Sequence, residues 1–242
     1  MIDRPITTLF MLSSLDGKIS TGDMDEMDTD SDFRKIKGIK EGVQQYYDLE
    51  KTTDMHFLIT GKVMTKQCES LNVNNRKDEP TKLSANCIIV DGVHLQESGI
   101  LYLLKKFNSL TVVTTNENHP AIKIKSENLK IISYKDKINF SDLFKKLKSD
   151  YGIKRITIQS GGTMNAVLLR NKLIDRISLV VAPCLIGGKD TASLIGGESL
   201  HNQKELKYVK ALRLKRCDVL ENSYLHLQYD VINKKEVEKF VM

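Results

Sequence analysis

Short runs of β-branched and other apolar residues recur along the chain, separated by segments with helical spacing. Such alternation is typical of βα units, in which helices cover a largely parallel sheet. It predicts strands at residues 6–12, 56–60, 87–91, 110–114, 129–133, 155–159 and 176–182. It also predicts helices at residues 31–49, 98–107, 141–151 and 163–172.

The end of the chain follows a different pattern. Two long strands are predicted at residues 206–217 and 224–232, separated by Glu221-Asn222-Ser223. In the second, Leu225 and Leu227 alternate with polar neighbours, as in a half-exposed antiparallel strand. We therefore expect an α/β fold: a three-layer domain with a mixed, mostly parallel sheet and an antiparallel C-terminal hairpin. Nothing resembles a linker, so residues 1–242 are expected to form a single domain.

Polar residues mark the expected ends of several elements. Ser31 or Asp32 would cap the helix at 31–49, and Ser141 would cap the helix at 141–151. The polar, irregular stretch at residues 68–84 is expected to be a loop.

Charge and composition narrow the class of protein. The net charge is +6, from 37 basic and 31 acidic residues that are interleaved along most of the chain. Because we find no aromatic-rich basic strand, nucleic acid is an unlikely partner, and small anionic ligands suit the charge better. No apolar run approaches the roughly 20 residues of a membrane span. Four scattered cysteines and five histidines supply no close ligand pairs. We therefore expect no metal site and free thiols in the cytoplasm.

The strongest local motif is Gln159-Ser160-Gly161-Gly162-Thr163-Met164-Asn165, between a predicted strand and a predicted helix. Glycines at such a turn let backbone approach a ligand closely, and the N–H groups at a helix start favour a phosphate. A plain tight turn capped by Ser160 or Thr163 would have the same pattern. The motif matches neither the dinucleotide fingerprint nor a P-loop.

A second motif, Ser13-Ser14-Leu15-Asp16-Gly17-Lys18, follows the first predicted strand. A carboxylate and an ammonium at a strand end often face the crevice of an α/β sheet, although the motif taken alone favours an Asp-Gly surface turn. Residues 183–189 and 196–199 are two further Gly-containing segments that could form the rim of a site or ordinary turns.

Taken in order, these segments resemble the reductase domain of the bifunctional deaminase–reductase of riboflavin biosynthesis, a family with a dihydrofolate-reductase-like fold. The resemblance rests on residues 14–19, on the strands ending at Gly61 and Gly92, on residues 160–169, and on Leu173-Ile174-Asp175 leading to Ala182-Pro183 and Ile186-Gly187-Gly188. It covers about residues 4–231.

The resemblance implies hydride transfer from NADPH that reduces the ribosylamino side chain of a phosphorylated pyrimidine to a ribitylamino group. It implies cofactor contacts at Leu12, Ser13, Gly61, Gly92, Ser160, Gly161, Gly162, Thr163, Met164 and Asn165. Substrate contacts are implied at Ser31, Arg76 and Gln159, and Asp16 and Lys18 are the candidate catalytic residues. A homodimer, with the C-terminal hairpin as a possible surface, is also implied.

The sequence departs from this family around the expected substrate. Gln159 stands where the family commonly has Glu, and Met64 and Cys68 replace a Thr and an Asp of another motif. An amide can exchange hydrogen bonds but cannot act as a carboxylate base. Two alternatives therefore stay open: a diverged reductase of the same fold with another substrate, and a nucleotide-binding module without catalysis.

Overall fold

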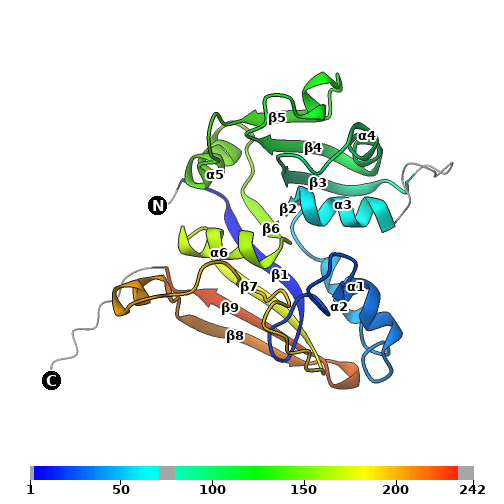
Figure 1. Ribbon diagram of the computed structural model, residues 1–242, viewed down its shortest axis with the longest axis vertical. Helices are drawn as coiled ribbons and strands as arrows, with labels where there is room; N and C mark the ends of the chain where they lie inside the picture. The colour runs from blue at the N-terminus through cyan, green and yellow to red at the C-terminus, as the bar shows by residue number, and fades with distance from the viewer. Residues whose placement is uncertain (1–2, 71–79, 234–242) are drawn as a thin grey trace.

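The computed structural model describes residues 3–70 and 80–233. Its centre is a nine-stranded sheet with the order β5-β4-β3-β2-β6-β1-β7-β9-β8. Neighbouring strands pair in parallel from β5 to β7, whereas β9 is antiparallel to both β7 and β8. Figure 1 shows this sheet crossing the molecule from β5 at one end to β8 at the other. The predicted mixed sheet with an antiparallel finish is confirmed.

The strands are β1 (Ile6–Ser14), β2 (His56–Thr60), β3 (Leu83–Val90), β4 (Phe107–Thr114), β5 (Leu129–Ser133), β6 (Arg155–Ile158), β7 (Arg176–Ala182), β8 (Leu212–Val219) and β9 (Leu225–Val231). The α-helices are α1 (Thr29–Asp32), α2 (Gln44–Glu50), α3 (Gly61–Ser70), α4 (Glu97–Lys106), α5 (Phe140–Ser149) and α6 (Gly162–Arg170). Each of the strands β1 to β7 lies within a few residues of its prediction.

Helices on both faces of the sheet make three layers. Because strand side chains alternate between faces, Leu9 of β1 packs in a core with α5 and α6, and its neighbour Phe10 packs on the opposite face. That opposite face carries two separate cores. One joins α3 and α4 to β2, β3 and β4, and the other joins Phe33 and Tyr46, near α1 and α2, to β1 and β7. Figure 1 shows α3 and α4 beside β3 and β4, and α1 and α2 together at a separate place nearer the end of β1.

The helix predicted at residues 31–49 is wrong as one continuous element. Asp28, not Ser31 or Asp32, caps α1 by accepting a hydrogen bond from the Asp30 N–H, and the chain turns extended at Ile36. Gly38 has a φ of +88°, a conformation that glycine adopts without strain. The break lets residues 33–43 pack around the end of β1 before α2 begins. The apolar spacing therefore indicated buried side chains correctly, but these side chains do not belong to one continuous helix.

Three other predicted boundaries are corrected. Asn139 caps α5 through its side chain, so Ser141 lies inside the helix. Residues Gln203–Tyr208 form a 3-10 helix, and the strand predicted at 206–217 begins only at Leu212. The loop predicted at 68–84 is helical up to Ser70 and extended from Leu83, and its centre lies outside the described residues.

A buried ion pair ties the start of the chain to the sheet. The Arg4 guanidinium donates to both carboxylate oxygens of Asp175 at 2.7 Å, and Asp175 also accepts from the Thr7 N–H at 3.0 Å. The Val231 N–H of β9 donates to the Asp175 carbonyl oxygen at 2.8 Å. Asp175 therefore joins β1, β7 and β9 at one point. Within residues 3–70 and 80–233, no helix has the length and apolar content needed to cross a membrane.

Candidate active site

A cavity of about 1150 Å³ extends from the carboxyl ends of β1, β2, β3 and β6 to the residues before β2 and at the starts of β3 and β4. These strands contribute Leu12, Thr60, Val90 and the residues that follow β6 to its wall. From this region the chain adds β3, β4 and β5 toward one edge of the sheet and β7 and β9 toward the other, so the strand order reverses here. Ligands of open α/β sheets bind in such a crevice, where the strand order reverses. The position and size of the cavity suit a dinucleotide together with a second small molecule.

The glycine-rich turn forms one wall of this cavity, and α6 starts directly from it. Gly161 is the N-cap residue with an extended backbone, and no side chain caps the helix. The first N–H groups of α6 therefore keep their capacity to bind, and Gly161, Gly162, Thr163 and Met164 all line the cavity. A helix start of this kind favours a phosphate, which fits the pyrophosphate of a dinucleotide.

Buried hydrogen bonds hold the turn in place. The Ser160 hydroxyl donates to Asn165 Oδ1 at 2.7 Å, and Asn165 Nδ2 donates to the Leu194 carbonyl oxygen at 2.9 Å. A Cβ on Gly162 would lie 2.1 Å from the Ser193 carbonyl oxygen, and the Gly196 N–H donates to the Gly162 carbonyl oxygen at 3.0 Å. Gly162 thus allows a close contact between two loops, and Asn165 acts from behind the cavity wall.

Asp16 and Lys18 contact the same distant segment from two sides. The Asp16 carboxylate accepts from the N–H groups of Ile186, at 3.1 Å, and Gly187, at 2.6 Å. Lys18 Nζ donates to the carbonyl oxygens of Gly188, at 2.7 Å, and Thr191, at 3.0 Å. Neither side chain is part of the cavity wall. The two residues instead fasten the loop whose later residues, Asp190 and Ala192, do line it.

The hydrogen bonds of Asp16 also set its protonation. The Ser14 hydroxyl and the Gly187 N–H lower the pKa of Asp16 to about 2, because both stabilise the carboxylate. Asp16 is therefore ionised across the physiological pH range. The charged carboxylate can accept the hydrogen bonds from both backbone N–H groups.

Gly61 and Gly92 lie on either side of a buried carboxylate, Asp91. Asp91 accepts from His119 Nε2 at 3.0 Å and contacts His94 Nδ1 at 2.9 Å, and backbone N–H groups of residues 94 and 95 also donate to it. Burial would raise the pKa of Asp91, but these hydrogen bonds outweigh it and lower the pKa. Gly92 and the partly exposed His94 line the cavity, whereas Gly61 begins α3 against Asp91 and is not part of the wall.

The opposite wall is acidic. Gln159 Nε2 donates to Glu50 Oε1 at 2.5 Å, and the Tyr47 hydroxyl donates to Asp30 Oδ1 at 3.1 Å. Burial, with repulsion from the nearby Asp28 carboxylate, raises the pKa of Asp30 to about 6. Burial likewise raises the pKa of Tyr47 to about 12. This wall presents hydrogen-bond acceptors, so it suits a ligand that is rich in N–H donors.

Cations border the cavity near its entrance. Lys62 and Lys66 of α3 both line it, and both contact the exposed Asp25 carboxylate, at 3.0 and 3.2 Å. Lys106, at the end of α4, also lines it. The cavity wall therefore combines lysines, the start of α6 and several carboxylates.

Eight of the predicted site residues line the cavity: Leu12, Gly92, Gln159, Ser160, Gly161, Gly162, Thr163 and Met164. Ser13, Gly61 and Asn165 are buried outside its wall. Ser31 is exposed on α1 and is not part of the cavity wall, and Arg76 lies outside the described residues. Sequence reasoning missed the lining residues Asp30, Tyr47, Glu50 and His94, which come from segments with no motif of their own.

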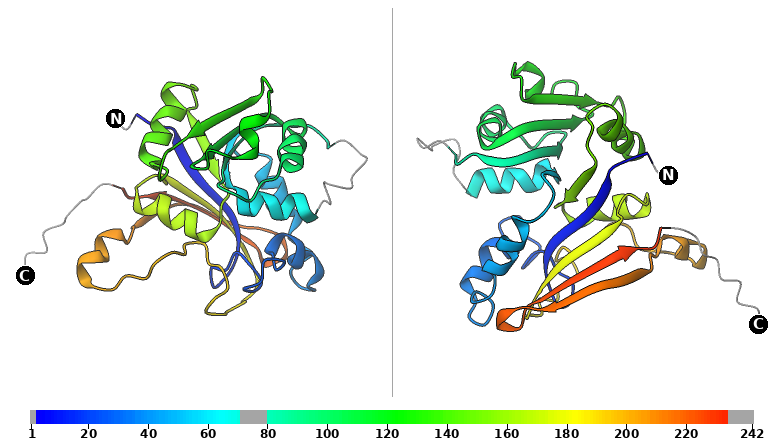
Figure 2. Two further views of the ribbon diagram at one scale, coloured as in Figure 1. Left: turned by 45° about the horizontal axis from the view of Figure 1, so that its top comes forward. Right: turned by 180° about the vertical axis from the view of Figure 1, so that it is seen from behind.

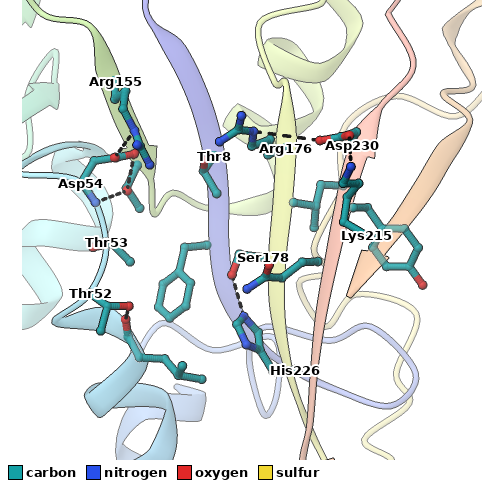
Figure 3. Close-up of a pocket in the computed structure, with 16 residues that line it drawn as sticks. Thr8, Thr52, Thr53, Asp54, Arg155, Arg176, Ser178, Lys215, His226 and Asp230 are labelled. Atoms are coloured by element: carbon teal, nitrogen blue, oxygen red, sulfur yellow. Dashed lines mark hydrogen bonds and ion pairs between the residues drawn. The ribbon is translucent and has the colours of Figure 1, made fainter. Parts of the chain in front are cut away.

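A second, smaller hollow of about 420 Å³ lies on the exposed side of β6, β1, β7 and β9. The right panel of Figure 2 shows β1, β7, β9 and β8 facing the viewer on this side. In Figure 3 its cations already contact carboxylates: Arg155 lies 2.7 Å from Asp54, and Lys215 lies 3.7 Å from Asp230. With its charges paired, this hollow is a weaker candidate for the active site.

Known proteins resemble this chain over most of its length. The model of the RibD C-terminal domain matches residues 5–225. A protein of Methanothermobacter thermautotrophicus named 2,5-diamino-6-ribosylamino-4(3H)-pyrimidinone 5′-phosphate reductase is 23% identical over 220 residues, covering 90% of this chain and 94% of the relative. A protein of the same name from Aquifex aeolicus is 30% identical over 128 residues, which cover 51% of this chain and 55% of that relative.

Solved structures show the same fold. RibD of Acinetobacter baumannii superposes with a TM-score of 0.64 at 17% identity, covering 95% of this chain and 58% of the other. A pyrimidine reductase-like protein of Corynebacterium diphtheriae gives a TM-score of 0.63 at 15% identity, covering 95% and 93%. The expected dihydrofolate-reductase-like architecture is thereby confirmed.

Proposed function

Because this chain belongs to the family of the RibD C-terminal domain, we propose that it is an NADPH-dependent reductase of a ribosylaminopyrimidine 5′-phosphate in riboflavin biosynthesis. The observation that carries the proposal is the uncapped start of α6 in a cavity of dinucleotide size at the strand-order reversal. The relative from Methanothermobacter, aligned over 94% of its length, supports the substrate class through its name.

The described residues fit the cofactor. The N–H groups at the start of α6, from Gly162 onward, would hold its pyrophosphate, and Leu12 at the end of β1 would meet the nicotinamide. Gly92, which also lines the cavity, would contact the adenosine end, and nearby His94 adds a hydrogen-bonding side chain to the wall. When bound, NADPH supplies a hydride, and the protein supplies position and electrostatics.

The reaction needs one hydride and one proton. A bound NADPH would supply the hydride for C1 of the ribosylamino group; the bond from C1 to the ring oxygen would then break, and that oxygen would take the proton as the sugar opens. Asp16 and Lys18, first considered for proton transfer or phosphate binding, contribute as positioning residues. This role is supported by their four hydrogen bonds to the backbone of residues 186–191, which fasten a loop of the cavity rim.

Further features complete the proposal. Residues 1–242 form one reductase domain, supported by the single sheet that runs through the described part. Two copies associate through β8, an edge strand whose exposed side chains include Leu212, Leu214 and Val219. The protein works in the cytoplasm, and the thiols of Cys184 and Cys217, which form no disulfide, are compatible with this location.

The test is NADPH oxidation by the purified protein, followed by absorbance, with the 2,5-diaminopyrimidinone or the 5-aminouracil form of the ribosylamino 5′-phosphate. We expect turnover with at least one of them and a ribitylamino product by mass spectrometry. NADH in place of NADPH is the cofactor control, and it should raise the melting temperature less than NADPH at equal concentration. A protein that binds NADPH but reduces neither compound would refute the proposal.

A further inference from the structure

Glu50 and Gln159 form a pair on the acidic wall of the cavity. Glu50 is the last residue of α2, and Gln159 follows β6 directly, with its backbone N–H bonded to the Leu58 carbonyl oxygen of β2 at 2.9 Å. Gln159 Nε2 donates to Glu50 Oε1 at 2.5 Å, and both residues line the cavity. The fixed strand end thus sets the position of the Glu50 carboxylate.

This contact leaves hydrogen-bond acceptors for a ligand. A carboxylate can accept about four hydrogen bonds, and Glu50 receives one that the structure records, from Gln159. The Gln159 amide also interacts with the Tyr46 hydroxyl, so the remaining lone pairs of Glu50 are the acceptors that this pair offers to a ligand. Asp30 lies on the same wall, close enough to Glu50 for the two charges to repel.

Three of the four lysines that line the cavity contact carboxylates other than Glu50. Lys51 contacts Asp48, and Lys62 and Lys66 contact Asp25. Among the described residues, no lysine or arginine forms an ion pair with Glu50 within 4.0 Å. The Arg34 guanidinium lies over the Tyr47 ring, 4.4 Å from its centre, and attracts the Asp30 carboxylate. The acidic wall therefore keeps a negative potential toward the cavity.

The two forms of the substrate differ at one edge of the pyrimidine. In the 2,5-diaminopyrimidinone, the N3–H and the 2-amino group are adjacent donors that match the two oxygens of one carboxylate. In the uracil form, a carbonyl oxygen replaces the 2-amino group, and a carboxylate facing it would meet a second acceptor. Charge-assisted hydrogen bonds are stronger than neutral ones, and a mismatched polar group in a closed site is costly.

We propose, on the basis of the function proposed above, that Glu50, positioned by Gln159, is the residue that selects the 2-amino form of the pyrimidine over the 2-oxo form. Glu50 accepts hydrogen bonds from the N3–H and the 2-amino group, and Asp30 reinforces the negative potential behind it. Reduction of the side chain then precedes hydrolytic removal of the 2-amino group, so a deaminase must act on the product of this protein.

The test measures binding of the two forms by calorimetry in the presence of NADP⁺, in addition to turnover. We expect the wild-type protein to bind the 2-amino form at least about tenfold more tightly, the ratio expected for one charged hydrogen bond. Glu50→Gln should bring this preference to about unity while leaving NADP⁺ affinity unchanged. The double variant E50Q/Q159E, which moves the carboxylate across the pair, should regain part of the preference.

Asp48→Asn is the matched control, because it removes the same charge from the same helix but lies outside the cavity wall. It should keep the wild-type preference. Asp30→Asn, a second variant should Glu50→Gln fail to fold, should reduce the preference severalfold.

The outcomes separate the two proposals. If the wild-type protein prefers the 2-amino form but reduces neither, the selection by Glu50 stands and the reductase function fails. If it reduces both forms and binds them equally, or if Glu50→Gln keeps the preference, the inference is overturned. If it binds neither form, both proposals are overturned.

Discussion

Asp30 belongs to an acidic run, residues 23–32, that composition alone places on a solvated surface. In the fold, Asp28 caps α1, Asp32 contacts Lys35, and Asp30 turns inward to the cavity and the Tyr47 hydroxyl. Three carboxylates at alternate positions thus have three different partners. Their spacing could not reveal this, because the partner of Asp30 comes from α2 and the cavity is formed by residues distant in sequence.

The pKa of Asp30 makes the stability of the protein depend on pH. The groups facing Asp30 are Asp28 and Glu50, which raise its pKa, and Tyr47 and Arg34, which lower it, while burial contributes most. The folded pKa of about 6 lies above the ordinary aspartate value of 3.8, so the folded protein binds this proton more tightly than the unfolded chain. The resulting stabilisation is full below the unfolded pKa and is lost as pH rises through about 6.

Asp30→Asn should remove this dependence. Compared with the variant, the wild-type protein should lose free energy of unfolding as pH rises from about 4 to about 7, the window set by the two pKa values. Urea unfolding of both proteins across that range is the measurement. Asp32→Asn serves as a control of opposite sign, because its pKa is lowered. Equal pH dependence of wild type and Asp30→Asn would contradict the assignment.

At the scale of elements, β-branched runs were reliable predictors, because strands buried on both faces require them. The residues 56–60, 129–133 and 176–182 are strands with the predicted bounds. Helical spacing was less reliable: Phe33, Ile39 and Val43 pack together around β1 although no continuous helix joins them. The start of the strand predicted at 206–217 is likewise part of a 3-10 helix, Gln203–Tyr208. A local pattern does not indicate how a segment packs against the rest of the protein.

The candidate site was predictable only where its residues belong to a local motif. The start of α6 follows from a local motif between a strand and a helix, and its residues do line the cavity. Glu50 and His94 belong to no such motif. They reach the cavity wall through the packing of α2 and of the loop after β3, which the local sequence does not indicate. The sequence predicted that Gly162 lets the backbone approach a ligand closely. The structure shows that Gly162 also lies against the backbone of Ser193.

Gly162→Ala tests this contact. The added methyl carbon would lie 2.1 Å from the Ser193 carbonyl oxygen, so the loop must move. We expect a loss of about 1–3 kcal/mol in the free energy of unfolding, as for an overpacked core, and weaker NADPH binding. Gly161→Ala is the matched control, since its methyl carbon would meet only Val63 Cγ2, at 3.9 Å. Chemical denaturation and NADPH fluorescence titration measure both effects, and equal stability of the two variants would contradict the expectation.

At the scale of the whole molecule, the helices leave the hairpin end of the sheet least covered. Seven of the eight residues of β8 are exposed, and the strand lies at the edge of the sheet. Natural proteins protect such edges, for example with charges, bulges or a partner. β8 has a register shift between Leu214 and Arg216 and several cations, yet it also exposes Leu212 and Leu214. This combination is the physical basis for the proposed association of two copies.

Leu214→Glu should therefore shift the protein from dimer to monomer, because a carboxylate would replace an apolar contact in the interface. Light scattering coupled to size-exclusion chromatography measures the mass directly. Leu101→Glu, at a similarly exposed leucine on α4, should leave the mass unchanged. A monomeric wild-type protein, or an unchanged dimer in Leu214→Glu, would contradict β8 as the interface.

The hydrogen bonds of Asp16, Lys18 and Asn165 have a consequence for transplanting this site. The turn after β1, the start of α6 and the loop at residues 186–196 hold one another by side-chain and backbone contacts. A chimera that received the glycine-rich turn alone would therefore lack the two segments that keep it in shape. Engineers who graft this cofactor cradle into another scaffold need to move all three segments as one cassette.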